Sequence, residues 1–176
     1  DETSALTPST TRGHHRVAAE SQWMTLFEHH NLPVHIFRLA GIYGPGRGPF
    51  AKVRKGTARR IIKENQVFSR IHVDDIASVL AASIAAPNPG SVYNVCDNDP
   101  APPQDVVSKA ARLMGVEPPA EIDFETAELS PMARSFYGEN KRVSNAKSRS
   151  VLGLNYEWPD YRTAFERMWK DGSWRG

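Results

Sequence analysis

The sequence predicts an α/β fold, in which helices cover a parallel sheet. A helical repeat of apolar residues is followed directly by a short β-rich segment, 34–40, and this order is typical of an α/β layer. A second β-rich segment, 91–96, follows another apolar helix. A doubly wound sheet needs more strands than these two. We therefore expect one edge of the sheet, and one face of the first helix, to lack partners.

Composition places the chain among globular proteins. Its 176 residues, 40% hydrophobic, suffice for one domain or a large piece of one. The 22 Lys and Arg against 20 Asp and Glu give a net charge of +2, which excludes a generic polycation that coats nucleic acid. The single cysteine, Cys96, excludes a disulfide framework and favours a reducing, cytoplasmic compartment. No apolar run approaches the roughly 20 residues of a membrane helix.

The first helix is predicted over about residues 12–30. Thr10 or Thr11 supplies its N-cap, and Asn31 marks its end. Apolar residues recur at roughly helical spacing within it: Val17, Ala19, Trp23, Met24 and Phe27.

A turn-rich loop, 42–49, follows the strand over 34–40. In open α/β sheets ligands bind at the carboxyl ends of strands, so this Gly- and Pro-rich loop is a candidate ligand contact. An ordinary surface turn explains the same composition.

Seven basic residues and no acidic one lie between Arg47 and Lys63, so the rest of the chain, with 15 basic and 20 acidic residues, nets about −5. One interpretation is a solvated helix face, and the other is a cradle for phosphate or carboxylate, which Arg binds well. Arg47 is the best candidate for such a cradle because it sits in the Gly-rich loop.

The middle of the chain predicts a strand or hairpin arm over 67–73 and an apolar helix that ends before Pro87. We expect Asp74 and Asp75 to cap this helix. His72 is either a polar ligand contact or a hydrogen-bonded structural histidine. Four further segments complete the prediction: a helix from Pro103 to Gly115, an irregular stretch over 116–140, a short helix capped by Ser144, and a last helix from Asp160.

Several site motifs are absent. The chain contains no G-x-G-x-x-G, P-loop or G-x-S-x-G pattern, so the usual loop that grips a dinucleotide is missing from it. The pairs His14-His15 and His29-His30 point apart on a helix and have no partner ligands at suitable spacing, so no metal site is expected.

Three segments carry a family resemblance. Residues 38–47 read R-x-x-x-x-Y-G-P-G-R, residues 70–77 read R-x-H-V-D-D-x-A, and residues 93–106 hold Y-N-V followed by P-P-Q-D-V. In this order they resemble the extended short-chain dehydrogenases/reductases, the NAD(P)-dependent epimerase/dehydratase group, whose second motif is one residue longer. With the preceding helix, the resemblance spans about residues 9–115.

The resemblance implies a fold: the C-terminal part of a doubly wound Rossmann-type parallel sheet plus a smaller substrate-side region. Residues 1–115 would belong to the Rossmann-type domain, with a substrate loop over 44–70, and residues 116–176 would form the substrate-side region. The family's glycine-rich cofactor loop lies near its own N-terminus, before the part that matches here. Because the chain also lacks an initiator Met, we expect it to be part of a longer protein.

In that family a Tyr-x-x-x-Lys pair precedes the first motif and performs the acid–base chemistry. The matching stretch here is 12–20, in which Gly13 and Glu20 hold the register, so Arg12 takes the Tyr position and Arg16 the Lys position. Arginine, with a pKa above about 12, is no acid or base near neutral pH but can bind ribose or phosphate oxygens. The chain therefore resembles an atypical, YeeZ-like branch without the usual pair.

The resemblance also implies roles for particular residues. Three backbone positions would lie near the nicotinamide of NAD or NADP: Ala40, Gly41 and Ile42. Three side chains would face a small-molecule substrate, nucleotide-linked or anionic: Tyr43, Arg47 and Arg70. No metal takes part.

Two functions follow as hypotheses. The first is an oxidoreductase, epimerase or dehydratase of which this chain is a fragment that by itself binds cofactor weakly or not at all. The second is a non-catalytic dinucleotide-binding sensor or scaffold on the same fold. If chemistry persists, another general acid must act, for example His14 or His15, although a solvent-facing role explains both histidines. A homodimer through the helix over 12–30 is implied as well, with Trp23 and Phe27 either anchoring it or packing on the sheet.

Overall fold

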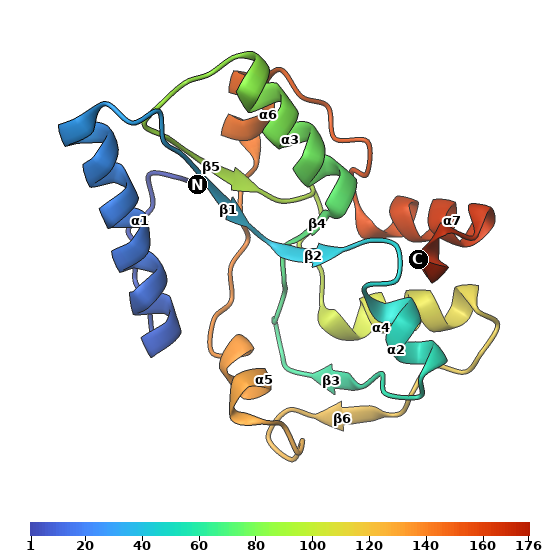
Figure 1. The fold of residues 1–176 in the computed structure, drawn as a ribbon. Helices are drawn as coiled ribbons and strands as arrows, with labels where there is room; N and C mark the ends of the chain where they lie inside the picture. The colour runs from blue at the N-terminus through green and yellow to red at the C-terminus, as the bar shows by residue number, and fades with distance from the viewer.

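The computed structural model describes all 176 residues and confirms the α/β class. Helices and strands alternate along the chain (Figure 1). The elements in order are α1 (Thr11–His30), β1 (His35–Leu39), β2 (Gly41–Tyr43), α2 (Pro49–Arg54), β3 (Arg60–Ile62), β4 (Arg70–His72), α3 (Val73–Ala85), β5 (Ser91–Val95), α4 (Pro103–Leu113), β6 (Glu121–Asp123), α5 (Pro131–Phe136), α6 (Ala146–Leu152), α7 (Tyr161–Asp171) and the 3₁₀ turn η1 (Ser173–Arg175). None of the helices is long and apolar enough to cross a membrane.

The strands form three parallel pairs, β1 with β5, β2 with β4, and β3 with β6. β1 and β2 follow each other in one extended segment. Up to Ala40 this segment is bonded to β5, and from Gly41 it is bonded to β4. The Ala40 N–H donates to the Val95 carbonyl (3.0 Å), and the next N–H, of Gly41, donates to the Ser69 carbonyl (3.1 Å). As expected, β1 has a hydrogen-bonded partner along one edge only.

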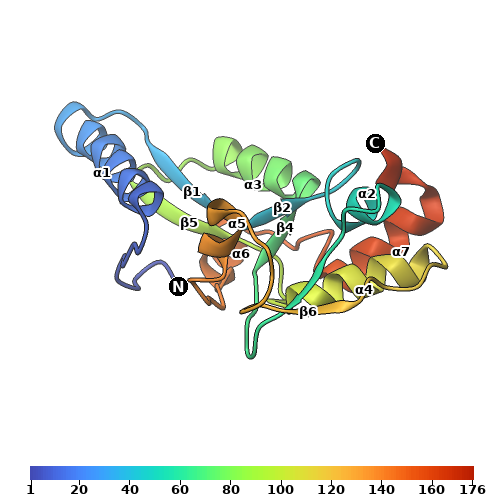
Figure 2. The ribbon, with the colours of Figure 1, turned by 90° about the horizontal axis from the view of Figure 1, so that it is seen from below.

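Two apolar clusters hold the strands and helices together. One lies between β4, β5 and α3 and contains Ile71, Val79, Tyr93, Val95 and Tyr156. The larger cluster joins the end of β2 to α2, α4 and α7, with Phe50 and Phe165 in ring contact at 5.0 Å between centroids. Figure 2 shows α4 and α7 at the opposite end of the molecule from α1. The division of the chain at residue 115 stays a prediction.

Helix α1 begins and ends where its capping residues predict. The Thr10 hydroxyl accepts a hydrogen bond from the Gly13 N–H, and Asn31 ends the helix in the left-handed conformation (φ 54°). No residue of α1 is buried, and Trp23 is 53% exposed. The helix therefore has no fully buried apolar position, unlike an amphipathic helix that is packed on a sheet.

Short elements depart from the prediction. The segment predicted as a loop over 42–49 begins inside strand β2, and the stretch over 116–140 is not wholly irregular, because it holds β6 and α5. The basic run over 47–63 contributes to helix α2 and to strand β3. Strands of three residues carry no readable periodicity, since their existence depends on pairing with a distant segment.

The predicted capping of α3 is wrong. His72 is the N-cap, and its Nδ1 accepts from the Asp74 N–H (3.2 Å). Asp75 lies in the first turn, but its carboxylate accepts from the N–H groups of Glu157 (2.9 Å) and Trp158 (3.1 Å). The structural reading of His72 is therefore supported, and Asp75 joins two segments that are distant in sequence.

At two other helices, one predicted N-cap is confirmed and one is wrong. Asp160 caps α7 as expected, accepting from the Thr163 N–H at 2.8 Å. The N-cap of α6 is Asn145 rather than Ser144, and its side chain bonds to the carbonyl of Cys96 instead (2.8 Å). Asn145 thus ties α6 to the end of β5.

Candidate functional site

The site predicted from the sequence is built around the end of the β1–β2 run. The backbone N–H groups of Ala40 and Gly41 are already bonded to the sheet, as described above. A Cβ on Gly41 would lie 3.4 Å from the Ser69 carbonyl oxygen, so the chain is closely packed on that side. The free side of residues 40–42 is the one that faces away from β4 and β5.

Tyr43 lies inside the protein. It pairs with His72 across β2 and β4, and in a parallel pair such partners carry their side chains on the same face. The two rings meet edge to face at 5.2 Å, and Tyr43 meets Phe165 in the same way at 5.8 Å. Its hydroxyl is buried without a protein hydrogen-bond partner. Burial, reinforced by the charge of Asp97, raises the pKa of Tyr43, so the phenol keeps its proton.

Arg70 is turned inward from β4. Its Nη1 donates to the carbonyls of Phe68 (2.7 Å) and Ala101 (3.1 Å), and its guanidinium carbon lies 5.9 Å from the centre of the Tyr161 ring. Burial lowers the pKa of Arg70. The structure thus brings Tyr43 and Arg70 together on one face of the β2–β4 pair.

His72 completes this buried layer. Its ring stacks on Trp158 with centroids 4.0 Å apart, and burial lowers its pKa. Because its Nδ1 accepts a backbone hydrogen bond, the ring is neutral with the proton on Nε2. Its approach to the Asp74 carboxylate, 3.6 Å, is therefore not an ion pair.

Asp97 lies directly beyond β5, and sequence reasoning missed it. The residue is 1% exposed; its Oδ1 accepts from the Asp99 N–H (3.2 Å), and its Oδ2 has no protein partner. Its own N–H donates to the Arg70 carbonyl (2.6 Å). Burial raises the pKa of Asp97 to about 7, although Arg70 acts in the opposite direction. A carboxyl group thus titrates near neutral pH at the carboxyl end of the sheet.

The glycine-rich loop holds Arg47 at the surface. Gly44 and Arg47 close a turn with reciprocal backbone hydrogen bonds of 3.1 and 3.0 Å, and the Gly46 N–H donates to the Trp174 carbonyl (3.1 Å). The Arg47 side chain is exposed and makes no hydrogen bond or ion pair within the protein. Of the three predicted substrate residues, Arg47 is the one free to reach a ligand, whereas Tyr43 and Arg70 are engaged in the interior.

Arg12 and Arg16 lie on the first turns of α1, both exposed and without ion-pair partners. Helix α1 runs antiparallel to β1 (Figure 1), and Glu20 pairs with Arg38 near the end of that strand. Arg16 and Arg12 lie one and two turns beyond Glu20, toward the end of the molecule where β1 continues into residues 40–42. Neither arginine forms a hydrogen bond or ion pair with residues 40–42, and their place beside a cofactor stays a prediction.

The Glu20–Arg38 pair was also missed, although Glu20 had fixed the register of its motif. Arg38 Nε donates to Glu20 Oε2 (3.0 Å), and Nη2 bonds to Oε1, so the pair is bidentate. Both side chains are less than a quarter exposed, and the carboxylate raises the pKa of Arg38. Phe27 makes another contact of α1 with the body, because it fills the space where Gly90 has no Cβ.

Replacing Glu20 with glutamine should loosen α1. The variant loses a charge-assisted bidentate contact of about 1–2 kcal/mol, so the amides of α1 should exchange with deuterium roughly tenfold faster. Glu28→Gln is the control, because Glu28 is exposed on the same helix and has no partner. Equal exchange in the two variants would show that the pair does not hold the helix.

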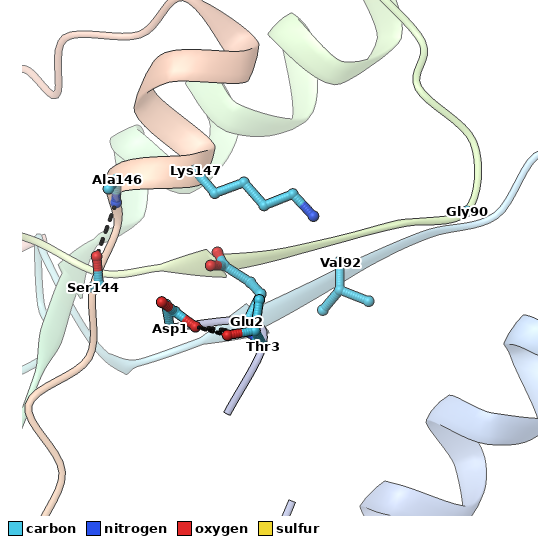
Figure 3. A pocket seen from close by; sticks show the side chains of 8 residues that line it. All are labelled: Asp1, Glu2, Thr3, Gly90, Val92, Ser144, Ala146 and Lys147. Atoms are coloured by element: carbon cyan, nitrogen blue, oxygen red, sulfur yellow. Dashed lines mark hydrogen bonds between the residues drawn. The ribbon is translucent and has the colours of Figure 1, made fainter. Parts of the chain in front are cut away.

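A separate cavity of about 460 Å³ lies along the free edge of β5. Its lining includes Glu2, Gly90, Val92 and Lys147, and Figure 3 shows Glu2 and Lys147 reaching toward the same space. Glu2 accepts from the Asn94 N–H at 2.7 Å. None of the predicted site residues lines this cavity. No three histidine, cysteine, aspartate or glutamate side chains gather closely enough to hold a metal ion.

Curated proteins are similar to the chain in sequence, whereas no family model matches it. Protein YeeZ of Escherichia coli strain K12 is 34% identical over 165 residues, which cover 90% of this chain and 52% of YeeZ. The 3-diazoavenalumate denitrifying reductase of a Streptomyces species is 27% identical over 145 residues, 75% of this chain and 46% of the reductase. The chain thus spans about half the length of these relatives.

Solved structures show the same fold. A conserved protein of unknown function from Silicibacter pomeroyi is 58% identical with a TM-score of 0.93, covering 98% of this chain and 60% of its own. The UDP-N-acetylglucosamine 4-epimerase of Bacillus cereus is 14% identical with a TM-score of 0.76, covering 100% and 59%. The dTDP-glucose 4,6-dehydratase of Bacillus anthracis, in complex with NAD, is 17% identical with a TM-score of 0.72, covering 99% and 57%. The chain therefore has the fold of the C-terminal portion of these epimerase and dehydratase structures, and it is a sequence relative of YeeZ.

Proposed function

We propose that this chain is the C-terminal portion of an NAD(P)-dependent oxidoreductase of the epimerase/dehydratase type that lacks the usual Tyr–Lys pair. The observation that carries the proposal is the open flank beside β1, where the strand has one free edge and the neighbouring α1 has no buried residue. The match covers only about half of YeeZ. We propose that an N-terminal half, absent from this chain, covers that flank.

The residues at the flank suit part of a dinucleotide. Arg12 and Arg16 are exposed and unpaired, and guanidinium groups bind phosphate and ribose oxygens well. Residues 40–42 offer backbone and small side chains for close approach by a nicotinamide, which supplies or accepts the hydride when bound. The grip on the cofactor's phosphates would come from the N-terminal half, since this chain has no glycine-rich fingerprint.

Reduction of a small substrate is the reaction that one sequence relative suggests. The Streptomyces relative is named as a reductase, and one solved neighbour was determined with UDP-glucuronic acid and NAD. Arg47, free at the surface loop, suits an anionic or nucleotide-linked substrate. Because arginine at positions 12 and 16 is no acid near neutral pH, the substrate's proton would come from another group, as His14 or His15 could provide.

A non-catalytic dinucleotide sensor is the second candidate. It is favoured by the two arginines themselves, which keep the capacity to bind phosphate and lose the capacity for proton transfer. Fold alone does not decide between sensor and enzyme.

We also propose a homodimer through α1 in a cytoplasmic protein. Trp23 is 53% exposed and free to anchor a partner, whereas Phe27 packs against Gly90. Cys96 is the single cysteine and a free, buried thiol, which suits a reducing compartment.

Cofactor titration tests the proposal. Nicotinamide fluorescence should show binding of NADH or NADPH by a form extended N-terminally to the length of the relatives, and weak or no binding by the 176-residue chain. Arg16→Ala should weaken binding by the extended form at least tenfold, while Arg149→Ala, an exposed change on α6, should leave it unchanged.

The outcomes separate the candidates. No binding by the extended form would contradict both functions, and tight binding by the 176 residues alone would contradict a phosphate grip outside them. Loss of nicotinamide absorbance with sugar nucleotides or simple carbonyls supports the enzyme, and cofactor binding without any turnover supports the sensor.

A further inference from the structure

Helix α3 carries a stripe of apolar side chains that is open to solvent. Val73, Leu80 and Ile84 are 43%, 42% and 79% exposed. Ala77, which lies between the first two, is exposed as well. Spacings of four, three and four residues place these side chains on one face of the helix, and no charged residue interrupts them. A contiguous apolar surface of this kind marks an interaction site, whereas single exposed apolar residues do not.

The opposite side of α3 is already in contact with the protein. Asp75 is two positions from Val73, which is a rotation of about 200° around the helix. Its carboxylate accepts from the N–H groups of Glu157 and Trp158. Between these two sides lies the buried residue Val79, which packs in the core cluster on the sheet. The helix therefore has one side on the sheet, one side against residues 157–158, and the stripe left free.

The free stripe lies on the side of α3 that is next to β2. A Cβ on Gly44, directly after β2, would lie 2.7 Å from Val73 Cγ1. β2 is bonded to β4 along one edge only, and β1 is bonded to β5 along one edge only. The stripe is thus on the side of the helix where the sheet ends in free strand edges. Helix α1 does not cover the stripe, because it lies apart from α3 in both views (Figures 1 and 2).

A further exposed apolar residue, Leu39 of β1, lies on the same face of the sheet as α3. Leu39 is 44% exposed and is two positions from Phe37, so the two side chains share one face of the sheet. Phe37 stacks on Tyr93 and packs against the cluster that contains Val79 of α3. Leu39 and the stripe therefore form apolar surface on one side of the sheet, next to its free edge.

The position of this surface indicates what covers it. In α/β folds, helices lie side by side on the sheet at about 8–10 Å, so a strand added along β1 would bring its own helix next to α3. About half of YeeZ lies outside its match with this chain, which is enough for several such units. The stripe extends over Val73–Ile84, or roughly 17 Å, which suits about three turns of a neighbouring helix.

We infer that the stripe of α3, together with Leu39, is the docking surface for an apolar helix of the N-terminal half, carried by a strand that continues the sheet beyond β1. The inference rests on the proposed N-terminal half and adds the surface that holds it. The absence of charge from the stripe requires an apolar face on the partner helix, since an unpaired charge buried there would be costly.

Cysteine labelling tests the inference in the form extended N-terminally to the length of the relatives. Ile84→Cys and Ser78→Cys each place a thiol at an exposed position of α3, one on the stripe and one outside it. Reaction with a maleimide is followed by mass spectrometry of the α3 peptide. The thiol of Ile84→Cys should react at least tenfold more slowly in the extended form than in the 176-residue chain, whereas that of Ser78→Cys should react equally in both.

Two labelling results would overturn the inference. One is an equal rate for Ile84→Cys in the two forms, which would leave the stripe uncovered. The other is protection that develops in the 176-residue chain as its concentration rises, because a second copy would then be the partner.

Urea unfolding provides a second readout. Leu80→Lys puts a charge in the middle of the stripe, so it should lower the midpoint of the extended form and leave that of the 176-residue chain nearly unchanged. Ser78→Lys, on the same helix but outside the stripe, is the matched control and should change neither midpoint. An unchanged midpoint for Leu80→Lys in the extended form would contradict the docking surface.

These readouts do not depend on cofactor binding. Protection of position 84 in an extended form that binds neither NADH nor NADPH would support the interface and contradict the proposed function. Cofactor binding with an unprotected position 84 would contradict the interface alone.

Discussion

Replacing Asp75 with alanine is expected to lower the free energy of unfolding by roughly 3–5 kcal/mol. The carboxylate is 1% exposed and is the acceptor for two backbone N–H groups, those of Glu157 and Trp158. The variant leaves both donors buried without a partner. It also releases Trp158 from its position on His72, where the two rings stack. Urea denaturation followed by circular dichroism measures the loss.

Asp74→Ala is the matched control for this prediction. The two aspartates are neighbours in sequence, but the Asp74 side chain is 59% exposed and contributes mainly to the helix dipole. Its loss should cost less than about 1 kcal/mol. Asp75→Asn should behave more like the alanine variant, since the amide NH₂ would oppose one of the two backbone donors. Similar losses in Asp74→Ala and Asp75→Ala would show that the buried carboxylate is not an anchor.

The contrast between these aspartates shows which features of the structure can be predicted from the sequence. Residue type and position predict that acidic side chains at 74 and 75 favour the start of a helix, and both do lie in the first turn of α3. The choice between capping that helix and bonding to residues 157–158 depends on a segment about eighty positions away. Local patterns carry no information on such a contact.

The same distinction separates the elements that were predicted from those that were not. Helix α1, expected over 12–30, spans Thr11–His30, because its apolar spacing and its caps are local signals. Strands β3 and β6 are three residues each and exist through pairing between Arg60–Ile62 and Glu121–Asp123. Neither segment alone has a pattern that indicates a strand.

The candidate site divides in the same way. The motifs located residues 40–43 just after a strand, whereas in the structure residues 41–43 form the strand β2. Arg70 and Asp97 are residue types that favour the surface, yet Arg70 donates to the distant Ala101 carbonyl and Asp97 is 1% exposed. No one-dimensional signal distinguishes Asp97 from an ordinary loop aspartate.

Asp97 should make the stability of the protein depend on pH. Its pKa is about 7 in the folded state against an ordinary value near 3.8, so the folded state holds the proton more tightly throughout that interval. The contribution of Asp97 to stability is therefore greatest below about pH 4 and falls as the pH rises toward 7, by on the order of 4 kcal/mol. Above pH 7 the loss is complete, because the carboxyl is then ionised in both states.

Asp97→Asn should remove this contribution and leave the variant more stable than the unmodified chain at pH 8. Urea unfolding between pH 4.5 and 8 measures both proteins, and the difference between their curves isolates Asp97. The subtraction is needed because His72 changes stability in the opposite direction. Burial lowers the pKa of His72, so its contribution to stability is present above about pH 6.5 and is lost as the pH falls. Asp105→Asn, an exposed change on α4, should run parallel to the unmodified chain. If Asp97→Asn also runs parallel, Asp97 is ionised in the folded protein across this range, and the buried carboxyl must then have drawn Arg70 into an ion pair.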